Sequence, residues 1–212
     1  MNHPANTLQQ GLQALQLDFS PGIQTQILNY LELLAQWNRV YNLTAVREVM
    51  DMVPKHVLDS LAILPYIYGT RILDVGTGAG LPGLLLAITR PDWQCVLLDR
   101  SAKKIRFVRQ AVIELNLENV ETVCTRIETF QSPNKFTSII SRAYKKLNAF
   151  YTQTARLCAT EGGLFAMKGT YPTAELAELA HLPIHLQSLL LQVPQLSAQR
   201  HLIIMRPLDK SS

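Results

Sequence analysis

A glycine-rich segment, residues 74–83 with the sequence DVGTGAGLPG, carries the chemistry most easily recognised in this chain. Gly76, Gly78 and Gly80 stand at alternate positions, which lets the backbone turn sharply and removes side chains that would keep a ligand away. A strand-to-helix turn that binds nothing is the alternative, but such a turn needs only one glycine. We therefore expect a ligand at this loop.

The identity of that ligand depends on the residues around the glycines. Residues 78–83 match GxGxxG, the dinucleotide fingerprint, which keeps a nicotinamide-dependent oxidoreductase open as the main alternative. However, Pro82 has no N–H to offer a pyrophosphate at the start of the next helix. Asp74, which we expect at the mouth of the loop, favours a cationic ligand. S-adenosylmethionine, with a sulfonium, an amino group and no phosphate, fits this pattern best.

Two later segments extend the predicted cofactor site. Asp99 follows Gly76 by 23 residues at the end of an apolar run, where a carboxylate can accept both ribose hydroxyls of an adenosine. The alternative is that Asp99 only caps the helix that starts after Ser101. Residues 126–128, Arg-Ile-Glu, follow the third predicted strand, where adenine would lie in a fold of this type. A solvated loop is the alternative there.

The residues that are missing narrow the reaction. The chain has no YxxxK pair for hydride-transfer chemistry, whereas methyl transfer needs mainly alignment of the acceptor with the methyl group. Residues 141–144 read SRAY, not the Asn/Asp-Pro-Pro-aromatic motif of exocyclic amine methylation, and no cysteine is placed to attack a pyrimidine. Guanine N7 or an easily ionised oxygen remains as acceptor. We expect no catalytic base, because guanine N7 carries no proton.

Arg142 and a set of basic residues are the remaining candidates. Arg142 could orient a base through its O6, or contact a phosphate or the cofactor carboxylate; pairing with a helix carboxylate is the alternative. A run of basic residues usually forms a solvated face. Here the position of the second group beside an aromatic residue favours RNA binding. The predicted RNA-binding residues are Arg100, Lys103, Lys104, Tyr144, Lys145 and Lys146.

An α/β fold must position these residues. Short apolar runs at 71–75, 95–99, 120–124, 136–141 and 164–168 are separated by helical lengths, as in a doubly wound, mostly parallel sheet. The last two runs, 186–193 and 201–206, are too close together for a helical crossover, which predicts a C-terminal antiparallel hairpin. We therefore expect a seven-stranded Rossmann-like sheet.

The first 68 residues have helical periodicity, with Ser20 as an N-cap and Pro21 at the first helical position. We expect an N-terminal helical cap over 1–68 and a Rossmann-like methyltransferase domain over 69–212. His56 and Asp59 lie three residues apart, so they could bond each other, close over the cofactor pocket, or tie the cap to the sheet. For Asn42 we favour a role at the start of a helix over a contact with the substrate.

Composition limits the remaining possibilities. Of 212 residues, 48% are hydrophobic and 17% charged, which is enough for one globular core. The chain has no apolar run of membrane-spanning length and no signal-peptide pattern, so we expect a cytoplasmic protein without membrane contact. Three cysteines without a CxxC motif predict reduced thiols, buried at Cys95 and Cys124, and no metal site.

Charge is distributed unevenly along the chain. Residues 1–68 carry three Lys or Arg and five Asp or Glu, whereas 69–212 carry seventeen and eleven. The basic part could meet a polyanion. A non-catalytic ribosome-binding module is therefore a second alternative to the methyltransferase.

Five segments in one order resemble a known family. They are WNRVYNLT (37–44), KHVLDSL (55–61), the glycine loop, SRA (141–143) and MKG (167–169). Together, from about residue 20 to 207, they resemble the RsmG (glucose-inhibited division protein B, GidB) family of bacterial 16S rRNA guanine-N7 methyltransferases. Residues 1–19 match no part of that pattern.

The resemblance implies a class I methyltransferase fold, S-adenosylmethionine as cofactor, and N7 of a guanine in the 530 loop of 16S rRNA as acceptor. Its partner would be 16S rRNA, within a small-subunit particle. Carried over by position, it implies cofactor contacts from Gly76, Leu81, Ile127, Glu128 and Arg142. For Arg142 the resemblance thus favours the cofactor over the base.

Overall fold

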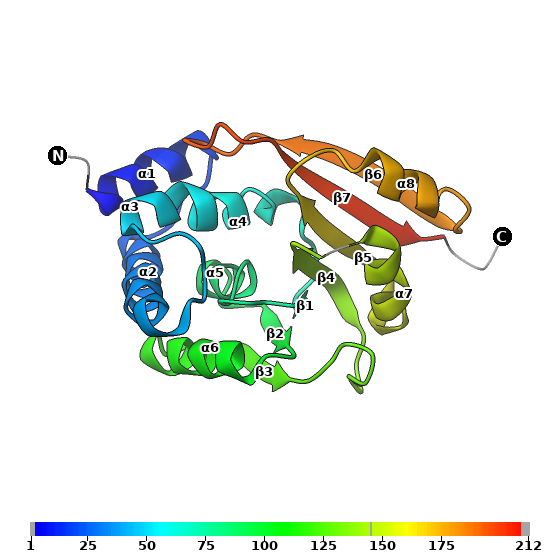
Figure 1. Cartoon of the computed structure of the whole chain (residues 1–212), viewed down its shortest axis with the longest axis horizontal. Helices are drawn as coiled ribbons and strands as arrows, with labels where there is room; N and C mark the ends of the chain where they lie inside the picture. Colours follow the sequence, from blue (N-terminus) through cyan, green and yellow to red (C-terminus); the bar gives the residue numbers. More distant parts are fainter. Residues whose placement is uncertain (1–2, 145, 209–212) are drawn as a thin grey trace.

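Seven strands form one twisted sheet in the computed structural model, which describes residues 3–144 and 146–208 (Figure 1). Their order is β3-β2-β1-β4-β5-β7-β6, and all neighbouring pairs are parallel except those that β7 makes with β5 and β6. The strands are β1 (Arg71–Val75), β2 (Gln94–Asp99), β3 (Val120–Cys124), β4 (Phe136–Arg142), β5 (Cys158–Lys168), β6 (Ile184–Leu191) and β7 (Arg200–Pro207).

The predicted α/β sheet and its C-terminal hairpin are confirmed, with one large difference in a strand boundary. β5 begins at Cys158, before the apolar run that starts at Leu164. Cys158 pairs with Phe136, and the register then shifts so that Gly163 pairs with Ser138. The intervening polar and glycine residues have no strand pattern, so this irregular start has no signal in the sequence.

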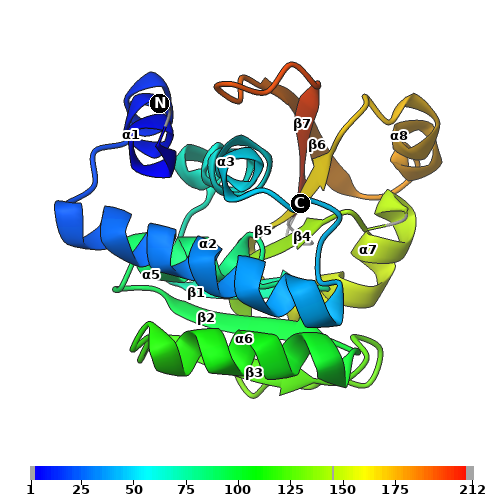
Figure 2. The ribbon, with the colours of Figure 1, turned by 60° about the vertical axis from the view of Figure 1, so that its left-hand side comes forward.

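Helices cover both faces of the sheet (Figure 2). A separate apolar cluster lies under each layer. On one face lie α5 (Gly83–Thr89), α6 (Ala102–Glu114) and the N-terminal helices. On the other lie α7 (Leu147–Thr154), the short η3 (Ala155–Leu157) and α8 (Thr173–Leu179).

The N-terminal segment is helical, as its periodicity predicts. Its elements are α1 (Pro4–Ala14), α2 (Pro21–Tyr41), α3 (Val49–Met52), the π-helical η1 (Val53–Leu58), α4 (Asp59–Leu61) and η2 (Leu64–Tyr66). Ser20 caps α2, because its Oγ accepts a bond from the N–H of Ile23. α1 buries Leu8 and Leu12 in the apolar cluster that also contains residues of β1 and β2. The division into a cap over 1–68 and a domain over 69–212 stays a prediction, and the two parts share this core.

Two further expectations have different outcomes. Cys95 is buried, but the prediction for Cys124 is wrong: this residue is exposed, because it lies on β3 at the edge of the sheet. Among the described residues, no helix is long and apolar enough to span a membrane.

The strand order places the glycine loop at a junction. The chain runs outward from β1 to β2 and β3, and then returns to β4 on the other side of β1. Ligands of open α/β sheets bind at such switch points, beyond the carboxyl ends of the strands. The register pairs Asp74 with Ile140, so Arg142 lies level with Gly76 across this junction.

Candidate functional site

The glycine loop leaves β1 with its first amides tied to the neighbouring strand. The N–H groups of Gly76 and Thr77 both donate to the carbonyl of Leu98, at 2.7 and 3.0 Å. Gly76 and Gly78 have φ of +73° and +61°, and a Cβ at Gly76 would have no atom within 4 Å. A Cβ at Gly78 would have only the Gly76 carbonyl, at 3.9 Å. The loop therefore presents open backbone on its outer side.

Gly80 has a different reason to be glycine. Its φ is +83°, and a Cβ there would lie 2.3 Å from the side chain of Leu84. The residue thus allows the loop to pack against α5. Its predicted contact with the cofactor is not tested by this packing.

Asp74 corrects an expectation about the mouth of the loop. β1 alternates, so Asp74 points to the same face as Ile72, where α5 begins, and it is only 1% exposed. Its Oδ2 accepts bonds from Thr77 Oγ1 at 2.6 Å and from the N–H of Gly83 at 2.9 Å. The carboxylate therefore lies beneath the loop and binds the first amide of α5.

Burial raises the pKa of Asp74 to about 6, although its two hydrogen bonds and the charge of Arg142 act in the opposite direction. Its other oxygen, Oδ1, is buried and has no partner among the described residues. Because Asp74 already accepts from the first N–H of α5, and Pro82 has none to offer, the helix start is poorly suited to a pyrophosphate.

Asp99 ends β2, where we predict a ribose contact, and its carboxylate bonds the glycine loop and the turn that precedes α6. Its Oδ1 accepts from the N–H of Ser101 at 2.8 Å, and its Oδ2 accepts from the N–H of Gly78 at 3.0 Å. The Nζ of Lys104 lies 3.6 Å from Oδ2. A carboxylate has about four acceptor sites, so the two hydrogen bonds from backbone N–H groups leave acceptor capacity for two hydroxyls.

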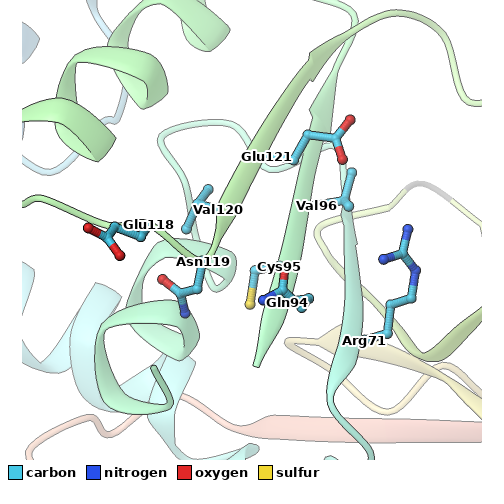
Figure 3. Close-up of a pocket in the computed structure, with 8 residues that line it drawn as sticks. All are labelled: Arg71, Gln94, Cys95, Val96, Glu118, Asn119, Val120 and Glu121. Atoms are coloured by element: carbon cyan, nitrogen blue, oxygen red, sulfur yellow. The ribbon is translucent and has the colours of Figure 1, made fainter. Parts of the chain in front are cut away.

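A hollow opens beside Asp99, beyond the ends of β2 and β3. Its lining is polar and contains no acid: Arg100, Ser101, Thr125, Arg126 and Thr129. A second hollow lies at the opposite edge, at the amino ends of the same strands, and contains Arg71, Asn119 and Glu121 (Figure 3). The Asn119 amide there donates to three backbone carbonyls, which gives it a structural role. Because the second hollow lies at the amino ends of the strands, it is remote from the glycine loop.

Arg142 reaches from the end of β4 to the N-terminal helices. Its Nη1 lies 3.4 Å from Oδ2 of Asp59 and 3.5 Å from the carbonyl of Lys55. The alternative of an arginine paired with a helix carboxylate is thus what the structure contains. Asp59 also accepts a bond from Nε of Arg200 at 2.7 Å, so it ties the N-terminal helices to β4 and β7.

His56 does not take part in that tie. Its Nε2 is 2.8 Å from Thr44 Oγ1, and its Nδ1 is 3.0 Å from the carbonyl of Lys55. Burial, and then the charge of Arg142, lower the pKa of His56 to about 4, so it is neutral at pH 7. The prediction that Asn42 begins a helix is wrong: it ends α2 in the left-handed conformation, with φ of +48°.

Comparison with known proteins places this arrangement in a family. The model of the family described as GidB, rRNA small subunit methyltransferase G, matches residues 23–203. The chain belongs to the GidB family. A relative from Laribacter hongkongensis, named ribosomal RNA small subunit methyltransferase G, is 50% identical over 92% of this chain and 95% of its own. One of the same name from Nitrosospira multiformis is 46% identical over 96% and 98%.

Solved structures agree on the fold. The O-methyltransferase TomG from Streptomyces achromogenes, in complex with S-adenosylmethionine, has a TM-score of 0.62 at 14% identity and covers 98% of this chain and 100% of its own. An O-methyltransferase described as putative, from Klebsiella pneumoniae, also has a TM-score of 0.62, at 16% identity over 93% and 94%. The GidB chain therefore has the class I S-adenosylmethionine-dependent methyltransferase fold, and the oxidoreductase suggested by GxGxxG is not supported.

The cofactor contacts implied by membership of the GidB family fall at residues of unequal exposure. Leu81 and Ile127 are 2% and 6% exposed and pack in the apolar clusters, whereas Glu128 is exposed. The carbonyl of Ile127 accepts a bond from Arg156 Nη2 at 2.7 Å, which fixes this turn. A ligand would thus meet the backbone of Leu81 and Ile127. These contacts stay predictions.

Several of the predicted RNA-binding residues of this GidB protein have protein partners of their own. Lys103 donates to the carbonyl of Tyr41 at 2.8 Å, and Lys146 lies 3.8 Å from Glu178. The ring of Tyr144 lies against that of Phe150 in a tilted arrangement, with 5.3 Å between the centroids, and its hydroxyl bonds Gln153. Lys145 lies outside the described residues. The described lysines and arginine of this set form a basic surface, which comprises Arg100, Lys103, Lys104 and Lys146.

Two residues that matter to the site were not predicted to do so. Tyr30 on α2, fully buried, donates from Oη to the carbonyl of Ala79 in the glycine loop at 2.7 Å. The sequence marks it only as part of a buried helical face. Lys168 bonds Glu175 at 2.9 Å, and Glu175 in turn accepts from the N–H of Leu147 at 2.7 Å. The bonds of Tyr30 to Ala79 and of Leu147 to Glu175 have no local sequence signal, because each joins distant segments.

Proposed function

We propose that this protein transfers a methyl group from S-adenosylmethionine to N7 of a guanine in the 530 loop of 16S rRNA. The observation that carries the proposal is membership of the GidB family, with the family model matching residues 23–203. We further propose that the substrate is a small-subunit particle in the cytoplasm, and that residues 1–68 act as a cap over the methyltransferase domain.

The residues at the switch point fit the cofactor chemically. The open backbone at Gly76 and Gly78 allows close approach of a ligand. Asp99 would accept the ribose hydroxyls, and adenine would enter the hollow between Arg100 and the turn at residues 126–129. Asp74 lies beneath the loop and would act on the ligand only through the loop backbone that it fixes. Arg142 would contact the carboxylate.

When bound, S-adenosylmethionine supplies an activated methyl group on its sulfonium. The chain's contribution is alignment and exclusion of water, because N7 of guanine already has a free lone pair. No side chain has to remove a proton. His56 and Asp74 are both held in internal hydrogen bonds, which agrees with a reaction without a catalytic base.

The basic surface supports RNA as the acceptor. Lys103 and Lys146 are exposed, and the Arg100 side chain lines the hollow at the same edge of the sheet. We propose that these residues bind phosphate and do no chemistry. Each phosphate contact that is lost should reduce the salt slope of RNA binding by about 0.7 to 1.

One experiment tests the proposal as a whole. The protein is incubated with methyl-labelled S-adenosylmethionine and either small-subunit particles or naked 16S rRNA, and the modified nucleotide is mapped. We expect label at N7 of one guanine in the 530 loop, with the particle as the better substrate. Label at another position, or RNA binding without transfer, would reject the proposal; the second result would favour a non-catalytic ribosome-binding module.

A further inference from the structure

Asp59 on α4 connects two arginines from strands that are not neighbours. Arg142 ends β4 and Arg200 begins β7, and β5 lies between these strands. The carboxylate is 4% exposed and contacts Arg200 through Oδ1 and Arg142 through Oδ2. A single acidic side chain of the N-terminal helices thus holds both arginines above the sheet.

This cluster has an excess of positive charge. Two guanidinium groups, each 24% exposed, face one carboxylate. His56 is neutral at pH 7, and Lys55 directs its Nζ to Asp51 at 2.8 Å. A partly buried cluster with unbalanced charge is costly until an anion joins it. The charge of this cluster therefore favours an anionic group of a ligand.

The two arginines are held unequally. Arg200 has short bonds, from Nε to Asp59 at 2.7 Å and from Nη1 to the carbonyl of Gln199 at 2.8 Å. Arg142 has only long ones, at 3.4 and 3.5 Å, and both use Nη1. Within the described part of the chain, Nε and Nη2 of Arg142 donate to no protein acceptor. Paired donors of this kind match the two oxygens of a carboxylate.

We infer that Asp59 is a positioning residue: anchored by Arg200, it holds one edge of Arg142 so that the other edge receives the carboxylate of bound S-adenosylmethionine. The inference rests on the proposed function, since it requires the cofactor at the glycine loop. When the register is continued two residues beyond Asp74 and Ile140, Arg142 lies level with Gly76, at the carboxyl edge of the sheet where the loop begins. Asp59 itself touches no reacting atom.

The test compares two ligands that differ in the carboxylate. S-adenosylhomocysteine has it, and methylthioadenosine lacks the whole amino-acid end. The change Asp59→Asn keeps the shape of the side chain and removes its charge. We expect it to weaken S-adenosylhomocysteine binding by about tenfold and to leave methylthioadenosine binding unchanged, as measured by calorimetry.

Variants of both neighbours complete the test. Arg142→Gln should show the same selective loss, about tenfold or more, and the double variant with Asp59→Asn should lose little beyond Arg142→Gln alone. Asp51→Asn is the matched control, because Asp51 is an exposed carboxylate nearby whose partner is Lys55. It should leave both affinities unchanged. If Asp59→Asn does not fold, Arg200→Gln removes the anchor instead and should show the selective loss.

Equal weakening of both ligands by Asp59→Asn or Arg200→Gln would overturn the inference, because it would make Asp59 a structural tie only. An unchanged ligand ratio in Arg142→Gln would overturn it as well. Failure of the proposed function is a separate result: the wild-type protein would then bind neither ligand.

Discussion

The glycine loop and the basic surface border the same edge of the sheet but are constructed in opposite ways. In the loop, backbone amides and buried side chains are fixed by short bonds, such as Gly76 to Leu98 at 2.7 Å and Tyr30 to Ala79 at 2.7 Å. The basic surface consists of side chains that reach into solvent: Lys146 is 66% exposed and lies 3.8 Å from Glu178, although Lys103 donates to Tyr41 at 2.8 Å. A ligand of fixed shape gains from a preorganised site, whereas phosphates of a flexible polymer need charge more than geometry.

The largest expected effect separates the two kinds of glycine within the loop. Gly78→Val places branches in the ligand's space, so S-adenosylhomocysteine binding should weaken by more than about 100-fold. Because position 78 has a positive φ, the valine should also destabilise the folded state by about 1–2 kcal/mol. Gly80→Val is the contrast, because its Cβ would meet Leu84 and should lower the thermal midpoint more strongly. Calorimetry and thermal unfolding check both; equal affinity loss without a difference in midpoint would contradict this assignment.

The second prediction concerns the pH dependence of stability that follows from two buried groups, Asp74 and His56. The pKa of Asp74 is raised from 3.8 to about 6, so the folded state binds more protons than the unfolded state in this range and stability falls as pH rises through it. The pKa of His56 is lowered from 6.5 to about 4, so the unfolded state binds more protons and stability rises with pH. The two contributions offset each other in the wild type.

Single variants should reveal each contribution. As the pH rises from 4 to 6.5, the free energy of unfolding of Asp74→Asn should increase by about 3 kcal/mol relative to that of wild type. Over the same range, that of His56→Gln should decrease by about 3 kcal/mol relative to wild type. Urea unfolding across that range measures both. Parallel pH profiles for all three proteins would show that neither group is buried as described.

Tyr30→Phe tests the link between the N-terminal helices and the loop. The change leaves the carbonyl of Ala79 buried without its donor, which should cost about 1–3 kcal/mol of folding free energy. We also expect weaker S-adenosylhomocysteine binding, because the loop loses one of its fixed points. Tyr41→Phe, on the same helix, serves as the control. Loss of stability with unchanged affinity would mean that this bond does not organise the loop for its ligand.

The smallest effect belongs to the basic surface. Lys146→Gln should reduce the salt slope of rRNA binding by about 0.7 to 1 and leave cofactor affinity unchanged. Arg90→Gln is the control, since Arg90 is a half-exposed cation at the opposite edge of the sheet, paired with Asp92 at 3.3 Å. Filter binding across a salt series measures the slope. An unaltered slope for Lys146→Gln would make this residue a solvated cation.

Local patterns predicted most of the fold. Apolar runs and their spacing located the strands, and Ser20-Pro21 located the start of α2, because these signals arise from neighbouring residues. The sequence did not reveal that Asp74 faces inward to cap α5, since its environment depends on which face of β1 is covered. The bonds of Tyr30 to Ala79 and of Asp59 to Arg200 join residues far apart in the chain, and no periodicity marks such pairs.

The most direct test of the loop is a pair of calorimetric titrations, with S-adenosylhomocysteine and with NAD. Asp74 occupies the first amide of α5 and Pro82 offers none, so the site should take an adenosine ligand without a pyrophosphate. We expect saturable binding of S-adenosylhomocysteine and none of NAD. Saturable binding of NAD, without binding of S-adenosylhomocysteine, would contradict a methyltransferase site at this loop.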